Sequence, residues 1–429
     1  MKKKKPIKDS SFAVYGLGLS GKSVLKFLKR KKIKKIYSWD DSERKNNKKN
    51  FYLFKKKLDE VDYIVISPGI NIQKTKFKLT LFRNKKKIIT DLDLFYMQKI
   101  PIKSIVITGT NGKSTVCKLT QHIFKTNKLD TQLGGNIGKP ILDLKIKKKS
   151  IVIIEASSFQ LSYTKFIKPT FAAILNISND HLDWHSTITN YKNSKFKIFS
   201  KQDASDYALL NNTKLIKLFK KKNYLSKLRV IGKSSINSTI KKKIINNYLL
   251  TKPNLENLVF AHQISKLFKI KEKTFLKAVN NFKGLPHRHE TFLKKNKITF
   301  INDSKATSFE STKYALKNNK NIFWIFGGLP KIKDNFNLLG VTSNIIKSFI
   351  IGKKTIYFKN EIKKKLKYKI SFNLNNAVKD VFKELLILKD SKATVLFSPA
   401  SASYDQFNNF TERGNQFKKI TREYVKKFF

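Results

Sequence analysis

The feature of this chain that most constrains its fold is a glycine-rich run, Gly109–Thr115, which lies between two apolar segments. Residues 104–108 before it are predicted to form a buried strand, and residues 116–124 after it are predicted to form a helix. A strand, a glycine turn, a lysine with hydroxyl residues and a helix form a phosphate cradle, because glycines let backbone amides approach the oxygens and the helix N-terminus attracts anions. The run therefore predicts an α/β domain that binds phosphate groups.

The loop departs from the strict phosphate-binding pattern, in which a glycine stands six positions before the lysine. Ile107 occupies that position, so the run is a shortened variant, G-x-x-G-K-S-T. An ordinary glycine turn before a helix is the alternative, and the strand and helix around the run favour the phosphate loop. The residues expected to contact nucleotide phosphates are Gly109, Thr110, Asn111, Gly112, Lys113, Ser114 and Thr115.

Composition limits the class of protein. The chain has 429 residues, of which 40% are hydrophobic, and this length predicts two to four domains with buried cores. The single cysteine, Cys117, excludes a disulfide framework and a cysteine metal site, and favours a reducing cytoplasm.

Apolar runs are too short for a membrane span. The basic start leads into a short apolar stretch broken by glycines, so we expect a tail before the first strand, not a signal peptide.

The net charge of +62 raises the question of a nucleic-acid partner. The positive residues are mostly lysines spread over the whole length, and Ile, Asn and Phe are also abundant. These four residue types share A/T-rich codons, whereas nucleic-acid readers favour arginine. We therefore expect compositional drift and no specific nucleic-acid partner, although the charge still promotes adhesion to polyanions.

Short apolar strands alternate with amphipathic segments along the chain, which predicts parallel, Rossmann-like sheets. We expect an α/β fold of three domains, covering residues 1–98, 99–284 and 285–429, with the phosphate loop in the central one. Gly16, Gly18 and Gly21 fit a G-x-G-x-x-G spacing after the first strand, which is a weak signal and also fits a plain tight turn. Residues 214–250 show only short β-like pieces, and residues 418–429 predict a C-terminal helix.

Polar residues at strand ends are the candidates for chemistry. Glu155 follows a buried strand, and beside a triphosphate a carboxylate holds Mg²⁺, although a paired structural acid is the alternative. His181 suits a general base, a substrate contact or a structural role, and the local sequence around Lys195 indicates only a solvated helix face. Arg288, one of few arginines, favours a contact with phosphate or ribose. The polar clusters at strand ends around Asp303 and over residues 398–407 suggest a second, charged substrate. The residues thus predict an ATP-dependent enzyme that also binds a nucleotide-like ligand and a small anion.

Taken together, the motifs resemble those of the Mur ligases of peptidoglycan synthesis, from Gly16 to the region of Phe417. The most specific motifs are Gly109–Thr115, Gly134–Gly138, Glu155–Leu161, Asn179–His181, Leu285–Arg288, Asn302–Thr307 and Ser398–Gly414. The resemblance implies a UDP-binding Rossmann-like domain, a central P-loop ATPase domain and a C-terminal Rossmann-like domain that binds an amino acid.

The resemblance also implies a reaction. ATP phosphorylates the carboxylate of UDP-N-acetylmuramoyl-L-alanine, and the amine of D-glutamate attacks the acyl phosphate, with two Mg²⁺ ions as cofactors. The run Ser398–Gly414 favours D-glutamate, and the Asp-Asn-Pro-Arg signature of relatives that add diaminopimelate or lysine is absent. A sister ligase, a folylpolyglutamate synthetase and an inactive ligase fold that binds polyanions are the alternatives. We expect a monomer.

The site residues carried over by this resemblance fall into groups. Lys113, Glu155, His181, Lys195 and Lys305 match catalytic positions. The metal positions are Ser114, Thr115 and Glu155 for one Mg²⁺, and His181 with a carbamylated Lys195 for a second. Asn254, Asn257, Arg288 and Asp303 match nucleotide contacts. The UDP-substrate contacts are Gly16, Leu17, Gly18, Leu19, Ser20, Asp40, Ser67 and Asn136. The remaining substrate contacts are His287, Thr307, Lys331, Ser403, Tyr404 and Phe410.

Overall fold

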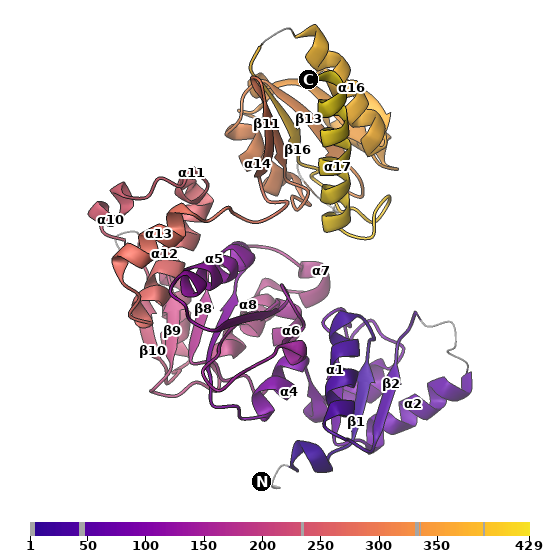
Figure 1. Cartoon of the computed structure of the whole chain (residues 1–429). Helices are drawn as coiled ribbons and strands as arrows, with labels where there is room; N and C mark the ends of the chain where they lie inside the picture. Colours follow the sequence, from indigo (N-terminus) through magenta and orange to yellow (C-terminus); the bar gives the residue numbers. More distant parts are fainter. Residues whose placement is uncertain (1–4, 43–47, 233–235, 331–333, 335, 389–390) are drawn as a thin grey trace. The chain divides into compact units, whose positions relative to one another are not determined.

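The structure is a computed structural model that describes residues 5–42, 48–232, 236–330, 334, 336–388 and 391–429. Its contacts separate two compact units, Met1–Lys283 and Gly284–Phe429. The first unit contains two sheets and the second contains one (Figure 1). The fold is α/β with three parallel-rich sheets, as predicted. The boundaries proposed after residues 98 and 284 stay predictions.

The first sheet has the strand order β2-β1-β3-β4, and all its neighbours are parallel. Its strands are β1 (Phe12–Tyr15), β2 (Ile36–Trp39), β3 (Tyr63–Ile66) and β4 (Ile88–Ile89). Its helices are α1 (Leu19–Arg30), α2 (Lys48–Glu60), α3 (Lys78–Arg83) and α4 (Asp91–Met97). The carboxyl ends of β1, β2 and β3 therefore lie at one edge, where a doubly wound sheet binds its ligands.

The central sheet has the order β10-β9-β8-β5-β7-β6 and is entirely parallel. Its strands are β5 (Lys103–Thr108), β6 (Thr131–Gly135), β7 (Ile151–Glu155), β8 (Phe171–Ile174), β9 (Tyr207–Leu210) and β10 (Lys227–Val230). Its helices are α5 (Lys113–Thr126), α6 (Ser158–Tyr163), α7 (Leu182–His185), α8 (Ile188–Phe196), α9 (Thr213–Lys221), α10 (Ser238–Lys242), α11 (Asn247–Leu250), α12 (Lys252–Leu267) and α13 (Glu272–Asn280). The first and central sheets share one buried apolar cluster, which includes Val14 and Val106.

The sheet of the second unit has the order β11-β12-β16-β13-β14-β15, in which only β11 is antiparallel to its neighbour. Its strands are β11 (Glu290–Lys295), β12 (Ile298–Asn302), β13 (Ile322–Gly327), β14 (Ile345–Ile351), β15 (Tyr368–Phe372) and β16 (Ala393–Phe397). Its helices are α14 (Phe309–Lys317), α15 (Thr355–Ile362), α16 (Leu374–Ile387) and α17 (Phe410–Phe428). Buried side chains on both faces of this sheet form two apolar clusters.

Two local predictions were confirmed only in part. Among the described residues of 214–250, β10 is a short strand of the kind predicted, whereas the helices α9, α10 and α11 were not predicted. Helix α9 forms because Asn212 caps its first turn and Leu215 and Phe219, one helical turn apart, are both buried. The C-terminal helix begins at Phe410, well before residue 418, because the Asn409 side chain accepts a hydrogen bond from the Glu412 amide.

Candidate active site

The glycine-rich loop joins β5 to α5, as the sequence predicted. Gly112 is the N-cap of α5 and has a left-handed φ of 85°, which a glycine adopts without strain. A Cβ atom at this position would lie 2.1 Å from Oδ1 of Asn257, so the loop and α12 approach too closely for a side chain. Ser114 and Thr115 are buried in the first turn of the helix. The first amides of α5 are therefore available to an anion at this loop.

The lysine of the loop folds back over its own turn. The Lys113 Nζ donates hydrogen bonds to the carbonyls of Gly109 (2.9 Å) and Thr110 (2.8 Å). This arrangement places an ammonium group directly above the loop, where it can neutralise phosphate oxygens.

Residues outside the loop hold its conformation. The Asn176 side chain accepts from the Asn111 amide (2.9 Å) and donates to the Asn111 carbonyl (3.2 Å). The Thr110 hydroxyl lies 3.0 Å from the hydroxyl of Tyr191. Burial raises the pKa of Tyr191 to about 12, so its hydroxyl is protonated at neutral pH. The sequence did not identify Asn176 and Tyr191 as loop partners, although the position of Asn176 just after β8 was a usable signal.

Glu155 ends β7 and is 2% exposed. Its Oε1 accepts a hydrogen bond from the Asn136 side chain (2.8 Å), and its buried Oε2 has no hydrogen-bond partner among the described residues. An unpaired buried carboxylate oxygen is costly unless it gains a partner, and Mg²⁺ prefers oxygen ligands. The residues present thus fit a Mg²⁺ ion. Asn136, which we expected at the UDP-substrate, contacts Glu155, and its substrate role stays a prediction.

Lys195 is buried, which corrects the interpretation of its local sequence as a solvated helix face. It is 1% exposed, and its Nζ donates to the Gly109 carbonyl (2.8 Å), the same carbonyl that Lys113 contacts. The Nζ also lies 4.6 Å from the centroid of the Tyr191 ring. Burial, together with the nearby charge of Lys113, holds the pKa of Lys195 well below its usual value. A lysine in this environment is readily neutral and therefore nucleophilic.

His181 lies at the start of α7 with a left-handed φ of 52°. Its ring centroid is 4.7 Å from that of Phe159, and its Nε2 lies 3.4 Å from a carboxylate oxygen of Asp180. The part of the chain that the structure describes holds no cluster of three or more His, Cys, Asp or Glu side chains suited to a metal.

The first sheet brings its predicted residues to one edge. Gly16 follows β1 with a φ of 90°, and its carbonyl accepts a hydrogen bond from the Ser67 hydroxyl (2.6 Å). The Leu17 amide donates to the Asp40 carboxylate, which also accepts from Ser42. These hydrogen bonds, the one from Ser42 first, lower the pKa of Asp40. Gly18 caps α1, and Leu19 and Ser20 form its first residues.

Two of the residues expected to contact the nucleotide, Asn254 and Asn257, belong to α12 in the first unit. The Asn257 side chain donates to Oδ1 of Asn254 (3.1 Å), and the Asn254 side chain donates to the Tyr248 carbonyl (3.0 Å). Asn257 also closes over Gly112, as described above, so this pair lies beside the phosphate loop. Their contact with the nucleotide stays a prediction.

In the second unit, Asp303 follows β12 and is buried. Its carboxylate accepts from the Ser398 hydroxyl (2.8 Å) and the His289 amide (2.9 Å). Burial raises the pKa of Asp303 to about 7, against the effect of these hydrogen bonds and of the Arg288 charge. Arg288 and Asp303 are thus close enough to interact.

Two contacts involve predicted substrate residues of this unit, His287 and Phe410. The side chain of Asn302 lies 2.9 Å from Nδ1 of the buried His287, and the Lys305 Nζ lies 3.9 Å from the centroid of the Phe410 ring. Thr307 is half-buried, Ser403 is buried and Tyr404 is exposed. Lys331 lies outside the described residues.

Arg413 is a residue that the sequence analysis missed. It is 1% exposed, and its guanidinium donates to the Ser304 hydroxyl (3.1 Å) and to the carbonyls of Ser304 (2.9 Å) and Ser401 (3.0 Å). Arg413 thereby joins the loop after β12 to the loop after β16. The sequence signals for it were its place in the motif Ser398–Gly414 and the rarity of arginine in a lysine-rich chain.

These features define an α/β enzyme of the P-loop class, with a phosphate cradle, a buried carboxylate and a buried lysine at one edge of the central sheet. Residues 107–271 match the Mur ligase middle domain. UDP-N-acetylmuramoylalanine–D-glutamate ligases of full length are similar to the whole chain. That of Rickettsia prowazekii is 32% identical over 97% of this chain and 99% of its own length. That of Aquifex aeolicus is 33% identical over 95% and 98%, and that of Buchnera aphidicola is 35% identical over 96% and 97%.

Solved structures agree in fold. The UDP-N-acetylmuramate-alanine ligase MurC of Thermotoga maritima has a TM-score of 0.59 at 14% identity, covering 97% of this chain and 100% of its own. A MurF of Acinetobacter baumannii has a TM-score of 0.59 at 14% identity, covering 84% and 85%. The chain belongs to the Mur ligase family. Among its described residues, no helix is long and apolar enough to cross a membrane.

Proposed function

We propose that this chain is an ATP-dependent ligase that joins the amine of D-glutamate to the alanyl carboxylate of UDP-N-acetylmuramoyl-L-alanine, in peptidoglycan precursor synthesis. The observation that carries the proposal is the similarity over nearly the full length to ligases named for this reaction, at 32% and 33% identity. The phosphate loop, Glu155 and Lys195 supply the chemistry that such a ligase needs. We propose further that the enzyme is a cytoplasmic monomer.

The first step activates a poor electrophile. An oxygen of the alanyl carboxylate attacks the γ-phosphorus of ATP, and the bond to the β,γ-bridging oxygen breaks, which gives an acyl phosphate and ADP. The amides at the start of α5 and the Lys113 ammonium neutralise the charge that moves onto the phosphate oxygens. Bound Mg²⁺ would polarise these oxygens, and Glu155, Ser114 and Thr115 are the residues that would hold it.

The second step forms the amide. The neutral amine of D-glutamate attacks the acyl carbon, the tetrahedral intermediate expels phosphate, and the amine loses a proton. We assign the binding of D-glutamate to Thr307, Lys331, Ser403, Tyr404 and Phe410, with Lys305 at a catalytic position beside them in sequence. These residues are expected to position the amine of D-glutamate for attack and to neutralise the two carboxylates of D-glutamate.

Lys195 is proposed to carry a carbamate. Its neutral amine would attack CO₂ and lose a proton, so that a cation becomes an anionic oxygen ligand for the second Mg²⁺, together with His181. The burial of Lys195 and its lowered pKa support this assignment, because only the neutral amine reacts with CO₂. A ¹³C label from bicarbonate, retained on wild-type protein and absent from Lys195→Met, is the expected outcome.

Phosphate release is the test of the proposed reaction. The purified chain is mixed with ATP, Mg²⁺ and UDP-N-acetylmuramoyl-L-alanine, with D-glutamate, L-glutamate or L-lysine added in turn. We expect release that depends on D-glutamate alone. Release with another amino acid would keep the mechanism and reassign the substrate, and no release from folded protein would overturn the proposal.

A further inference from the structure

The first unit contains a cavity of about 970 Å³ that none of the predicted site residues lines. Tyr63, the first residue of β3, and Ser104, near the start of β5, both line it. The glycine-rich loops of the two sheets follow the opposite, carboxyl ends of β1 and β5. At about 3.3 Å per residue, the five residues from Ser104 to Gly109 span roughly 16 Å. The cavity is therefore separate from the candidate active site.

The charged lining of this cavity has one sign. Six lysines line it, Lys5, Lys8, Lys31, Lys99, Lys168 and Lys201, and none of its lining residues is an aspartate or a glutamate. Lys5 and Lys168 are paired with Asp62 and Asp203 outside the lining. The other four have no carboxylate within ion-pair distance among the described residues. An anion inside the cavity would therefore supply charge that this part of the protein lacks.

The rest of the lining is mostly apolar, and Gln98 and Ser104 are its polar residues. It includes the rings of Tyr63, Phe95, Tyr96 and Phe166, with Met97 beside them. Phe95 and Tyr63 are buried, and the Tyr96 hydroxyl is already satisfied by Ser104 at 2.9 Å. These side chains pack against the apolar cluster shared by the two sheets, which fixes the wall in place. An aromatic ring or alkyl group packed against this wall would be removed from water, and few polar groups of the wall would lose their hydrogen bonds.

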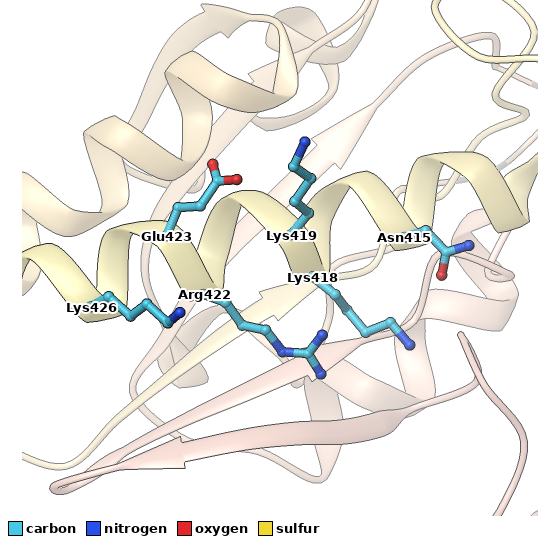
Figure 2. A pocket seen from close by; sticks show the side chains of 6 residues that line it. All are labelled: Asn415, Lys418, Lys419, Arg422, Glu423 and Lys426. Atoms are coloured by element: carbon cyan, nitrogen blue, oxygen red, sulfur yellow. The ribbon is translucent and has the colours of Figure 1, made fainter.

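A second basic hollow, on α17, shows that charge alone does not make such a site. Figure 2 shows its six lining side chains projecting from one helix: Asn415, Lys418, Lys419, Arg422, Glu423 and Lys426. The hollow has a volume of about 430 Å³ and no apolar lining residue, and it includes a carboxylate. Lys418 is also paired with Glu290 at 3.1 Å. The α17 hollow is thus a solvated basic surface, and it provides a matched control.

We propose that the cavity beside Tyr63 and Ser104 binds a small amphipathic anion, with an aromatic body against the apolar wall and one phosphate or carboxylate group among the lysines. The wall selects the body and the lysines select the head group. Because the two sites lie at opposite ends of β5, this anion and ATP are expected to bind at the same time.

Calorimetry with 1-naphthyl phosphate tests the proposal on the full chain, with ATP and Mg²⁺ saturating so that the phosphate loop is filled. We expect saturable binding, with 1-naphthoate also binding and inorganic phosphate binding at least about tenfold more weakly. The relative affinity of the two naphthyl probes identifies which head group is preferred. Equal affinity for inorganic phosphate, or loss of naphthyl phosphate binding when ATP is added, would overturn the proposal.

Paired variants locate the probe. The double variant Lys99→Glu/Lys201→Glu is expected to weaken naphthyl phosphate binding at least about tenfold. Two positive charges that attract the phosphate group become two negative charges that repel it. Lys419→Glu with Lys426→Glu makes the same change of charge in the α17 hollow and is expected to alter affinity less than about twofold. Met97→Gln, with folding checked by circular dichroism, is expected to weaken binding without changing charge. Equal losses in both lysine pairs, or no loss in Met97→Gln, would contradict a site at this cavity.

Discussion

Lys195 in the first unit and Arg413 in the second are two cations buried in nearly the same way. Each is 1% exposed, donates hydrogen bonds to backbone carbonyls and lies near an aromatic ring, Tyr191 at 4.6 Å and Phe397 at 5.9 Å. Neither has a carboxylate within ion-pair distance among the described residues. Both therefore bear the cost of removing a positive charge from water.

The two residues respond to that cost differently. Burial and the Lys113 charge hold the pKa of Lys195 well below its usual value, whereas burial lowers the pKa of Arg413 only to about 10. A lysine with a lowered pKa gives up its proton more readily than a solvated one, which reduces this cost, whereas arginine stays charged near neutral pH. The site of Lys195 therefore suits chemistry on a neutral amine, and that of Arg413 suits a permanent cation that holds two loops together.

The largest expected effect is that of Lys195→Met. We expect phosphate release to fall by about a thousandfold, because the variant lacks both the amine and the proposed oxygen ligand. We also expect the melting temperature to stay equal or rise, since methionine carries no charge to bury. Phosphate release with all three substrates and thermal melting by circular dichroism measure the two effects.

Lys125→Met is the control for this change, because Lys125 is an exposed lysine on α5. It is expected to leave both activity and melting temperature unchanged. A Lys195→Met protein with wild-type turnover would remove the functional difference between the two buried cations.

Arg413→Met should act mainly on stability. The substitution leaves the carbonyls of Ser304 and Ser401 without this donor, and each unpaired buried group costs about 1–3 kcal/mol. The Ser304 hydroxyl keeps its hydrogen bond to the Phe410 carbonyl. We expect a total loss of about 2–3 kcal/mol, read from the urea midpoint of the full chain, with Arg413→Lys losing about half of it.

Arg422→Met on the same helix is the matched exposed arginine and is expected to change stability by less than about 0.5 kcal/mol. If Arg413→Met were as stable as Arg422→Met, Arg413 would not hold its two loops together. The proposed contrast between a structural arginine and a reactive Lys195 would then be wrong for Arg413.

The sequence identified the phosphate loop because all its determinants are local: a strand, two glycines, a lysine and a helix within a few residues. It also placed Glu155, Asp40 and Asp303 at strand ends, since the carboxyl ends of parallel strands share an edge. It did not reveal the burial of Lys195, whose acceptor, the Gly109 carbonyl, lies 86 positions away. Arg413 was missed for the same reason, because its contacts with Ser304 span 109 positions. In a chain with 91 lysines and arginines, no local signal separates a buried cation from a solvated one.

Asp303 extends the comparison to a buried acid. Its folded-state pKa is about 7, above the usual 3.8, so the folded protein keeps a proton that the unfolded chain has already lost. Stability should therefore fall as pH rises from about 4 to about 7, by no more than about 1.4 kcal/mol per pH unit, and then level off. Asp303→Asn removes this titrating proton and keeps one oxygen, which can accept from either the Ser398 hydroxyl or the His289 amide, but not from both in the present geometry.

We expect the melting temperature of Asp303→Asn, relative to wild type, to rise between about pH 5 and about pH 7 and to stay constant above about pH 8. Asp183→Asn, a change at an exposed carboxylate, should give a constant difference over the same range. A flat difference for Asp303→Asn as well would show that the buried acid is ionised throughout, unlike Lys195.

The smallest expected effect is that of Tyr191→Phe, which separates the two contacts of this ring. The variant loses the hydrogen bond to Thr110 and keeps the aromatic face beside Lys195, so one partner of the phosphate loop is removed while the cation keeps its surroundings. One such hydrogen bond contributes about 1 kcal/mol, which corresponds to about a fivefold rise in the KM for ATP with little change in kcat. Tyr191→Leu removes the ring as well and is expected to lower kcat further. If the two variants had equal kcat, the ring would contribute nothing to the state of Lys195, and its burial and the charge of Lys113 alone would set its pKa.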